Sequence, residues 1–116
     1  KCFCHVEVEQ CLIVEFIPDV VDEMLRVPDA ASVATALWLE TQLGRKVGAS
    51  TGTNMWGVLQ LAARMREEGR TGSIVTLLCD SGERYLESYY NPQWVADNIG
   101  DIAPWQAEIA GLVERR

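Results

Sequence analysis

The sequence predicts an α/β fold, a partial parallel sheet with flanking helices, from three observations. Residues 73–79 form an uncharged run of β-branched and leucine side chains, which is typical of a strand buried on both faces. An amphipathic helical pattern precedes this run, as in the helix–strand units of parallel sheets. Polar stretches rich in glycine and hydroxyl groups stand at residues 48–54 and 80–85. We expect both as loops at one edge of the sheet, where the carboxyl ends of strands collect ligands.

Length and composition limit the class of protein. With 116 residues, of which 48% are hydrophobic, the chain can form one domain with one modest core. Its 10 basic and 17 acidic residues give a net charge of −7. This charge argues against nucleic acid as a partner, because a phosphate backbone is bound by clustered Lys and Arg. No apolar run reaches membrane-spanning length and no signal-peptide pattern is present, so we expect a cytoplasmic protein with no membrane partner.

The N-terminal residues 1–17 alternate between polar and apolar side chains and predict one or two short strands. Three cysteines, Cys2, Cys4 and Cys11, crowd this segment beside the only histidine, His5. They could bind zinc, but their spacing lacks the usual Cys-x-x-Cys pair, so reduced, unliganded thiols are favoured and we assign no metal site. Cys79 ends the apolar run, where we expect it as a small core residue.

Helical periodicity predicts the next elements. Residues 20–27 form a helical turn or a strand with its acidic side chains outward. Asp29 is a suitable N-cap for a helix from about Ala30 to Leu43, and Gly44 stands where a C-cap glycine belongs.

Two further helices follow from the same reasoning. Thr53 or Asn54 is the expected cap of the second helix, and Gly69 is its expected end. Its apolar stripe consists of Met55, Val58, Leu59, Ala62 and Met65. Pro104 suits the first position of a terminal helix, whose apolar face consists of Trp105, Ile109, Leu112 and Val113.

The two polar stretches each admit two interpretations. Residues 48–54 expose backbone N–H groups at the positive end of a helix dipole, which can bind a phosphate or a carboxylate, or they form a plain capped turn. No Gly-Lys-Ser/Thr follows, so this is not a P-loop. In residues 80–85, Ser81 can bond a ligand, or Gly82 supplies a positive φ in a tight turn. Ser81 is not supported as a nucleophile, because nothing marks His5 as its base.

The two stretches together resemble a known family. Gly-Ala-Ser-Thr-Gly-Thr-Asn at residues 48–54, a helix, the apolar run and Asp-Ser-Gly-Glu-Arg-Tyr-Leu at residues 80–86 are similar to the C-terminal part of pyridoxal-phosphate-dependent cysteine synthases. These belong to the fold type II group, with cystathionine β-synthase as a relative. The resemblance covers about Phe16 to Val95. It implies that the chain is a fragment of the large lobe of such an enzyme and forms a single partial α/β domain over residues 1–116. This domain consists of a divergent or truncated segment 1–15, a cysteine-synthase-like segment 16–95 and a C-terminal helix 96–116.

The resemblance implies pyridoxal 5'-phosphate as cofactor and assigns cofactor-binding residues. Ser81 matches the hydroxyl that bonds the pyridine nitrogen, and a neutral serine there suits β-elimination and β-replacement. A loop that lines the active site beside the cofactor is matched by Gly48, Ala49, Ser50, Thr51 and Gly52. The family's phosphate loop lies further upstream, so the anion-site interpretation gives way to a wall of the pocket.

The chain also departs from the family. Neither Lys1 nor Lys46 has the Ser-x-Lys-Asp context of the Schiff-base lysine, and the phosphate and substrate-carboxylate loops are missing. We therefore assign no catalytic residue and expect the chain to be inactive on its own. In the complete enzyme, which the resemblance implies to be a homodimer acting on an amino acid, the reaction replaces the β-substituent of an O-activated serine with sulfide or eliminates from cysteine. The alternative is a non-catalytic remnant or protein-interaction module that keeps the packing of the lobe.

Overall fold

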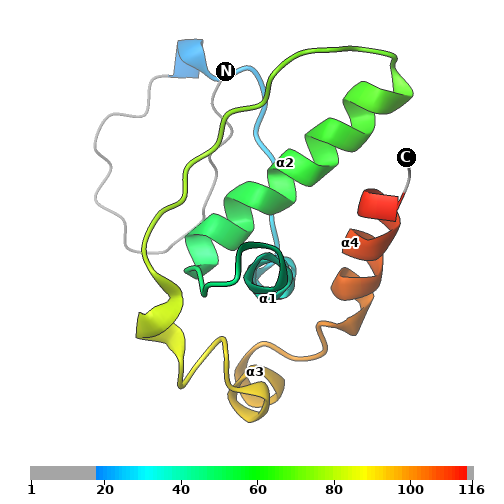
Figure 1. The fold of residues 1–116 in the computed structure, drawn as a ribbon. Helices are drawn as coiled ribbons and strands as arrows, with labels where there is room; N and C mark the ends of the chain where they lie inside the picture. Colours follow the sequence, from blue (N-terminus) through cyan, green and yellow to red (C-terminus); the bar gives the residue numbers. More distant parts are fainter. Residues whose placement is uncertain (1–17, 115–116) are drawn as a thin grey trace.

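The computed structural model describes residues 18–114, and helices dominate this part of the chain (Figure 1). The predictions for residues 1–17, including the zinc and free-thiol alternatives for Cys2, Cys4, Cys11 and His5, lie outside the described residues. The elements are η1 Pro18–Val20, α1 Asp29–Leu43, α2 Ala49–Glu67, η2 Gly82–Tyr85, α3 Pro92–Asn98 and α4 Ala103–Glu114. Between residues 18 and 114, no helix has the length and apolar character needed to cross a membrane.

The predicted partial parallel sheet is not formed by residues 18–114. Residues 71–79 carry no regular secondary structure, and the β pairing in the described part is one isolated antiparallel bridge between Val47 and Ser81. The prediction is wrong here because the apolar run has no neighbouring strand in the described part of the chain. Without a neighbour, the backbone N–H and C=O groups of a strand have no partners for their hydrogen bonds. Val75 and Leu77 are consequently 89% and 68% exposed. Cys79, expected in the core, is exposed too.

Helix α1 is the central element, and its predicted bounds are nearly those observed. Pro28 is the N-cap, whereas the predicted cap Asp29 is the first helical residue, where its carboxylate faces the positive end of the dipole. Gly44 ends the helix at φ 68° as predicted, and its N–H donates to the Glu40 carbonyl. Residues 31–36 are all buried, so the first half of α1 is covered on every side.

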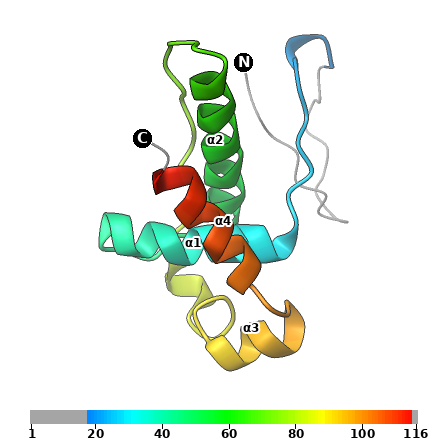
Figure 2. The same ribbon diagram turned by 90° about the vertical axis from the view of Figure 1, so that its right-hand side faces the viewer.

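The core lies where α1 crosses α2 and α4 (Figure 2). Trp56 of α2 packs edge-on against Trp105 of α4, with ring centroids 5.6 Å apart. Ile109, which is 1% exposed, joins Trp56 in a buried cluster with the alanines of α1. The buried residues of α2 are Thr51, Gly52, Trp56, Gly57 and Ala63, so the stripe predicted from Met55 to Met65 is only half buried. In α4 the predicted face is largely correct, with Ile109 at its centre and Val113 exposed.

Residues 21–28 run as an extended segment beside this core. Exposed and half-buried residues alternate along it, which is the period of a strand, and the helical-turn alternative is excluded beyond η1. Glu23 accepts two hydrogen bonds from the Arg64 guanidinium, at 2.8 and 2.7 Å, which fix the segment on α2. The segment thus covers one side of α2 without being part of a sheet.

Candidate functional site

The first predicted stretch is mostly helix. Gly48 is the N-cap of α2, and Ala49, Ser50, Thr51 and Gly52 form its first turn, so the helix begins earlier than the cap predicted at Thr53 or Asn54. Ser50 is exposed and Ala49 half buried, whereas Thr51 and Gly52 point inward. Gly48 is buried as well, so the predicted lining residues divide into an outer part, Ala49 and Ser50, and an inner part that holds the helix in place.

The inner part makes two contacts with the rest of the chain. A Cβ on Gly52 would lie 2.1 Å from the Ser32 carbonyl oxygen of α1, so only glycine permits this crossing. The Thr51 hydroxyl, in a residue that is 2% exposed, accepts a hydrogen bond of 2.9 Å from the Cys79 N–H. Asn54 donates from its side-chain nitrogen to the Leu77 carbonyl at 3.3 Å. Through these bonds α2 holds the end of the extended segment that leads to Ser81.

Ser81 lies directly beside the start of α2. The Gly82 N–H donates to the Lys46 carbonyl and the Gly48 N–H donates to the Asp80 carbonyl, both at 3.2 Å, so Val47 and Ser81 face each other. A Cβ on Gly82 would lie 2.5 Å from the Val47 nitrogen. Positive φ angles occur at Gly44, Gly69 and Gly100 in the described residues, so the positive φ expected at Gly82 is wrong. Glycine is required at 82 for close approach, not for a turn.

The Ser81 side chain has one hydrogen-bonding role that the structure defines. Its Oγ accepts from the Glu83 N–H at 3.3 Å and thereby caps η2. A hydroxyl that accepts in this way keeps its own hydrogen for another acceptor. Ser81 is exposed, so this hydrogen is available to a ligand at the surface.

Two tyrosines that sequence reasoning missed flank this bridge. The Tyr85 hydroxyl donates to Asp80 Oδ2 at 2.6 Å, and this bond raises the pKa of Tyr85. Tyr90 contacts the backbone of Val47 through its hydroxyl. Tyr85 belongs to the motif at residues 80–86 but was given no role, and Tyr90 carries no sequence signal, because the contacts depend on how residues 82–90 fold back.

Lys46 precedes the bridge and is engaged elsewhere. Its Nζ lies 2.6 Å from Glu40 Oε1 of α1 and 5.3 Å from the centroid of the Tyr90 ring. The hydrogen bond to Glu40 raises the pKa of Lys46. An amine held as ammonium is a poor nucleophile towards an aldehyde.

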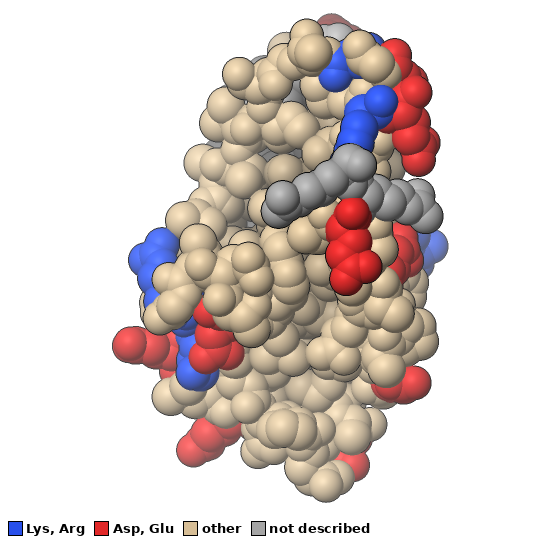
Figure 3. Space-filling model, turned by 45° about the vertical axis from the view of Figure 1, so that its right-hand side comes forward, with Lys and Arg blue, Asp and Glu red and all other residues tan. Residues whose placement is uncertain are grey.

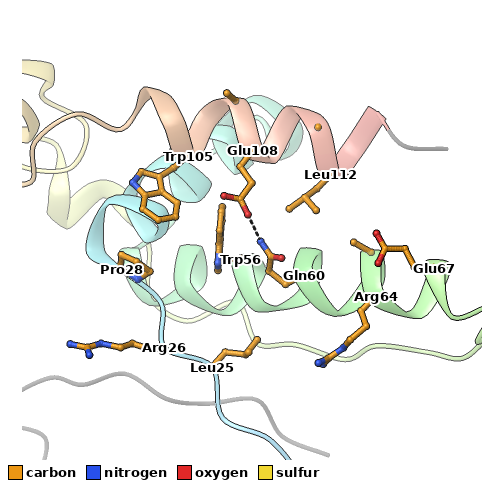
Figure 4. Close-up of a pocket in the computed structure, with 13 residues that line it drawn as sticks. Leu25, Arg26, Pro28, Trp56, Gln60, Arg64, Glu67, Trp105, Glu108 and Leu112 are labelled. Atoms are coloured by element: carbon orange, nitrogen blue, oxygen red, sulfur yellow. Dashed lines mark hydrogen bonds between the residues drawn. The ribbon is translucent and has the colours of Figure 1, made fainter.

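A wide groove lies away from these residues. It has a volume of about 850 Å³ and is formed by the segment at Leu25 to Pro28, α2 and α4, with Trp56, Gln60 and Trp105 among its lining residues (Figure 4). A second cavity of about 540 Å³ lies between α1 and α3 and is lined by Leu37, Tyr90 and Val95. None of the six predicted cofactor residues lines either cavity. Of these six, Ser50 and Ser81 are exposed and Ala49 is half buried, whereas the other three are buried.

Acidic and basic side chains are mixed on one face of the molecule. On the face shown in Figure 3, Lys and Arg side chains do not gather into a patch, and acidic side chains lie among them. Within residues 18–114, no cluster of His, Cys, Asp and Glu is suited to holding a metal ion.

Comparison with known proteins gives a consistent set of relatives, although no protein-family model and no solved structure matches the chain. An L-cysteine desulfhydrase of Mycobacterium tuberculosis is 56% identical over 100 residues, which are 85% of this chain and 26% of the relative. A putative pyridoxal-phosphate dependent protein of Caenorhabditis elegans is 38% identical over 66% of this chain and 18% of its own length. Cysteine synthase 2 of Emericella nidulans is 34% identical over 78% of this chain and 20% of its own length.

These relatives confirm the resemblance seen in the sequence. The chain matches a segment of each relative, and the class that these relatives define is that of pyridoxal-phosphate-dependent proteins. More particularly, the chain belongs to the family of cysteine synthases and cysteine desulfhydrases, which includes a cystathionine beta-synthase of Dictyostelium discoideum among its relatives. The chain spans about a quarter or less of the length of the relatives it matches.

Proposed function

We propose that residues 47–85 form one wall of the pyridoxal phosphate pocket in a cysteine-processing enzyme, with Ser81 donating to the pyridine nitrogen. The observation that carries the proposal is the hydroxyl of the exposed residue Ser81, which accepts from the Glu83 N–H. The accepted bond fixes the orientation of the oxygen and leaves its hydrogen for a ring nitrogen. The residues present therefore fit the cofactor on this side.

The other residues of the wall position Ser81 and shape the surface. Gly48 and Gly82 let two backbone segments meet without side chains between them. Ala49 and Ser50, at the start of α2, extend the surface next to Ser81. When bound, pyridoxal phosphate supplies an electron sink for carbanion chemistry at an amino acid, and a serine opposite its ring nitrogen suits β-elimination and β-replacement. Thr51 and Gly52 act from inside, through Cys79 and α1.

Among the two reactions of the family, we favour elimination from cysteine for the complete enzyme. The support is the 56% identity to the desulfhydrase, against 34% and 36% to the cysteine synthases of Emericella nidulans and Schizosaccharomyces pombe. The fold type II sheet, the homodimer, the amino-acid substrate and the cytoplasmic location are proposed for that complete enzyme as well.

We propose that the chain by itself is inactive, because Lys46 is paired with Glu40 and lies outside the wall. One observation favours the alternative of a protein-interaction module. The extended segment exposes Val75, Leu77 and Leu78, an apolar surface of the kind that another element or another protein covers. A remnant without the lysine would keep this surface and lose the cofactor, so cofactor binding separates the two hypotheses.

The test compares Ser81→Ala and Ser81→Asp in the complete product of the gene that encodes this chain. Ser81→Ala should weaken pyridoxal phosphate binding about fivefold, the equivalent of about 1 kcal/mol, with activity reduced rather than abolished. Ser81→Asp keeps an acceptor for the Glu83 N–H but lacks the donor, and its carboxylate should favour a protonated ring nitrogen and shift the visible spectrum.

A matched control is Ser73→Ala, which removes an exposed hydroxyl from the extended segment outside the wall. It should leave affinity and spectrum unchanged. If Ser81 only caps η2, then Ser81→Asp will also leave the spectrum unchanged, with and without cysteine. Identical spectra in wild type and both Ser81 variants would reject the cofactor role.

A further inference from the structure

The backbone of Val47 lies between Ser81 and Tyr90. In the bridge, the flanking residues Lys46, Gly48, Asp80 and Gly82 exchange the hydrogen bonds. An antiparallel pair of this kind leaves the N–H and C=O of the central residue pointing away from its partner. The two backbone polar groups of Val47 are therefore directed to the side opposite Ser81.

The Tyr90 hydroxyl satisfies both of these groups. It accepts from the Val47 N–H at 2.9 Å and donates to the Val47 carbonyl at 2.6 Å. Val47 is 3% exposed, so water cannot replace these bonds without local opening. One phenolic oxygen thus makes the two bonds that a neighbouring strand would make at this position.

Tyr90 is itself held in place. The Lys46 ammonium lies 5.3 Å from the centroid of its ring, and the hydrogen bond from Lys46 to Glu40 links both to α1. Burial raises the pKa of Tyr90, so the hydroxyl keeps the proton that it donates to Val47. The ring and the hydroxyl are therefore fixed by separate contacts.

We propose that Tyr90 is a positioning residue that holds Val47 in register and, through the bridge, holds Ser81 in the cofactor wall; the cofactor part of this inference rests on the proposed function. The two bridge bonds are both 3.2 Å long and belong to an isolated pair. An isolated pair of strands is only marginally stable in water, so the bridge needs a further support. Tyr90 provides it from the side that Ser81 does not occupy.

The experiment uses Tyr90→Phe in the complete gene product, with Tyr89→Phe as the matched control. Both variants remove one phenolic oxygen from the same turn, but no hydrogen bond in the described part of the chain involves the Tyr89 hydroxyl, whose ring packs against Tyr85 and Trp94. Tyr90→Phe leaves the Val47 N–H and C=O unpaired. Amide exchange at Gly48 and Gly82 should therefore accelerate about tenfold or more in Tyr90→Phe and stay unchanged in Tyr89→Phe.

The second readout is a double-mutant cycle on cofactor affinity. Tyr90→Phe should weaken pyridoxal phosphate binding by no more than Ser81→Ala does, and the double variant should bind about as weakly as Ser81→Ala alone, because Tyr90 acts through Ser81. Additive losses would show that Tyr90 acts by another route and would overturn the inference.

The outcomes separate the two proposals. If Ser81→Ala leaves affinity unchanged, the proposed function fails and the inference fails with it. If Ser81→Ala weakens binding while Tyr90→Phe changes neither exchange nor affinity, only the role of Tyr90 is rejected. If Tyr90→Phe does not fold, amide exchange in the wild-type protein provides the test. The Val47 amide should then exchange as slowly as the Gly82 amide, and faster exchange at Val47 would overturn the inference.

Discussion

Two glycines of α2 provide a sharp test of how the helices pack. Gly52 and Gly57 lie about 1.4 turns apart on the same helix, and both are buried. Alanine at Gly52 would place its Cβ 2.1 Å from the Ser32 carbonyl oxygen and 3.0 Å from the Ala36 nitrogen. Alanine at Gly57 meets no atom within 4 Å. The same substitution should therefore have opposite effects at the two positions.

The size of the effect at Gly52 follows from the geometry. Ordinary contact begins at 3.4 Å, so a Cβ at 2.1 Å is 1.3 Å too close, and the atom it meets belongs to the rigid backbone of α1. Relief requires α1 and α2 to separate, which loosens the packing of Trp56 against the alanines of α1. Overpacking of this kind costs about 1–3 kcal/mol, against a gain of about 1 kcal/mol from helix propensity. A separation of whole helices should cost an amount at the upper end of the overpacking range. After the gain from helix propensity, we expect Gly52→Ala to lower the free energy of unfolding by about 2 kcal/mol.

At Gly57 only the propensity remains, so Gly57→Ala should stabilise the protein by about 0.5–1 kcal/mol. The assay is urea denaturation followed by circular dichroism at the helical minimum, which gives a midpoint even for a broad transition. The expected order of midpoints is Gly57→Ala above wild type and Gly52→Ala below it. Equal shifts in the same direction would refute the close crossing of α1 and α2.

Three further predictions follow from single contacts. Treatment with pyridoxal phosphate and borohydride should leave Lys46 without a stoichiometric label, because Glu40 raises its pKa; a pyridoxyl group at Lys46 in the peptide map would contradict this. The chain on its own should bind a hydrophobic dye and unfold over a broad temperature range, because Val75 and Leu77 are exposed; a sharp transition without dye binding would count against it. Arg64 lowers the pKa of Glu23 from 4.5, so the pair stabilises the fold above that pH, and the contribution is lost as the pH falls through the lowered value. Urea midpoints of wild type and Glu23→Gln should differ at neutral pH and converge in acid, and a constant difference would reject the linkage.

Elements with local signals were predicted well from the sequence. The helix expected from about Ala30 to Leu43 is α1, and Gly44 and Gly69 adopt positive φ at the ends of α1 and α2, where they were expected. These signals act within a few residues, since a C-cap glycine relieves strain that any other side chain would suffer there. The family resemblance also depended on local order, because one of its two motifs forms the start of α2 and the other follows the next segment of the chain.

Elements that depend on partners were predicted poorly. The buried face of α2 follows Gly52 and Trp56 instead of the predicted stripe, because the helix packs closest where its partner offers small side chains. The apolar run at residues 73–79 has the composition of a buried strand, but strand formation depends on packing against neighbouring strands as much as on the residues of the strand itself. Tyr90 gave no signal at all, because its contact with Val47 spans 43 positions of the chain.

The place of Ser81 is nevertheless defined without a sheet. The segment that leads to it is fixed at Cys79 by the Thr51 hydroxyl and at Leu77 by Asn54, both side chains of α2. Beyond Cys79, the bridge between Ser81 and Val47 fixes the segment, and Gly48 and Gly82 allow the two backbones to approach each other. Each of these contacts lies between residues 46 and 90. The exposed apolar side chains between Val75 and Leu78 have room for contacts with a further element or another protein. The position of the hydroxyl is thus a local property of this segment. The stability of the segment depends on what covers Val75, Leu77 and Leu78.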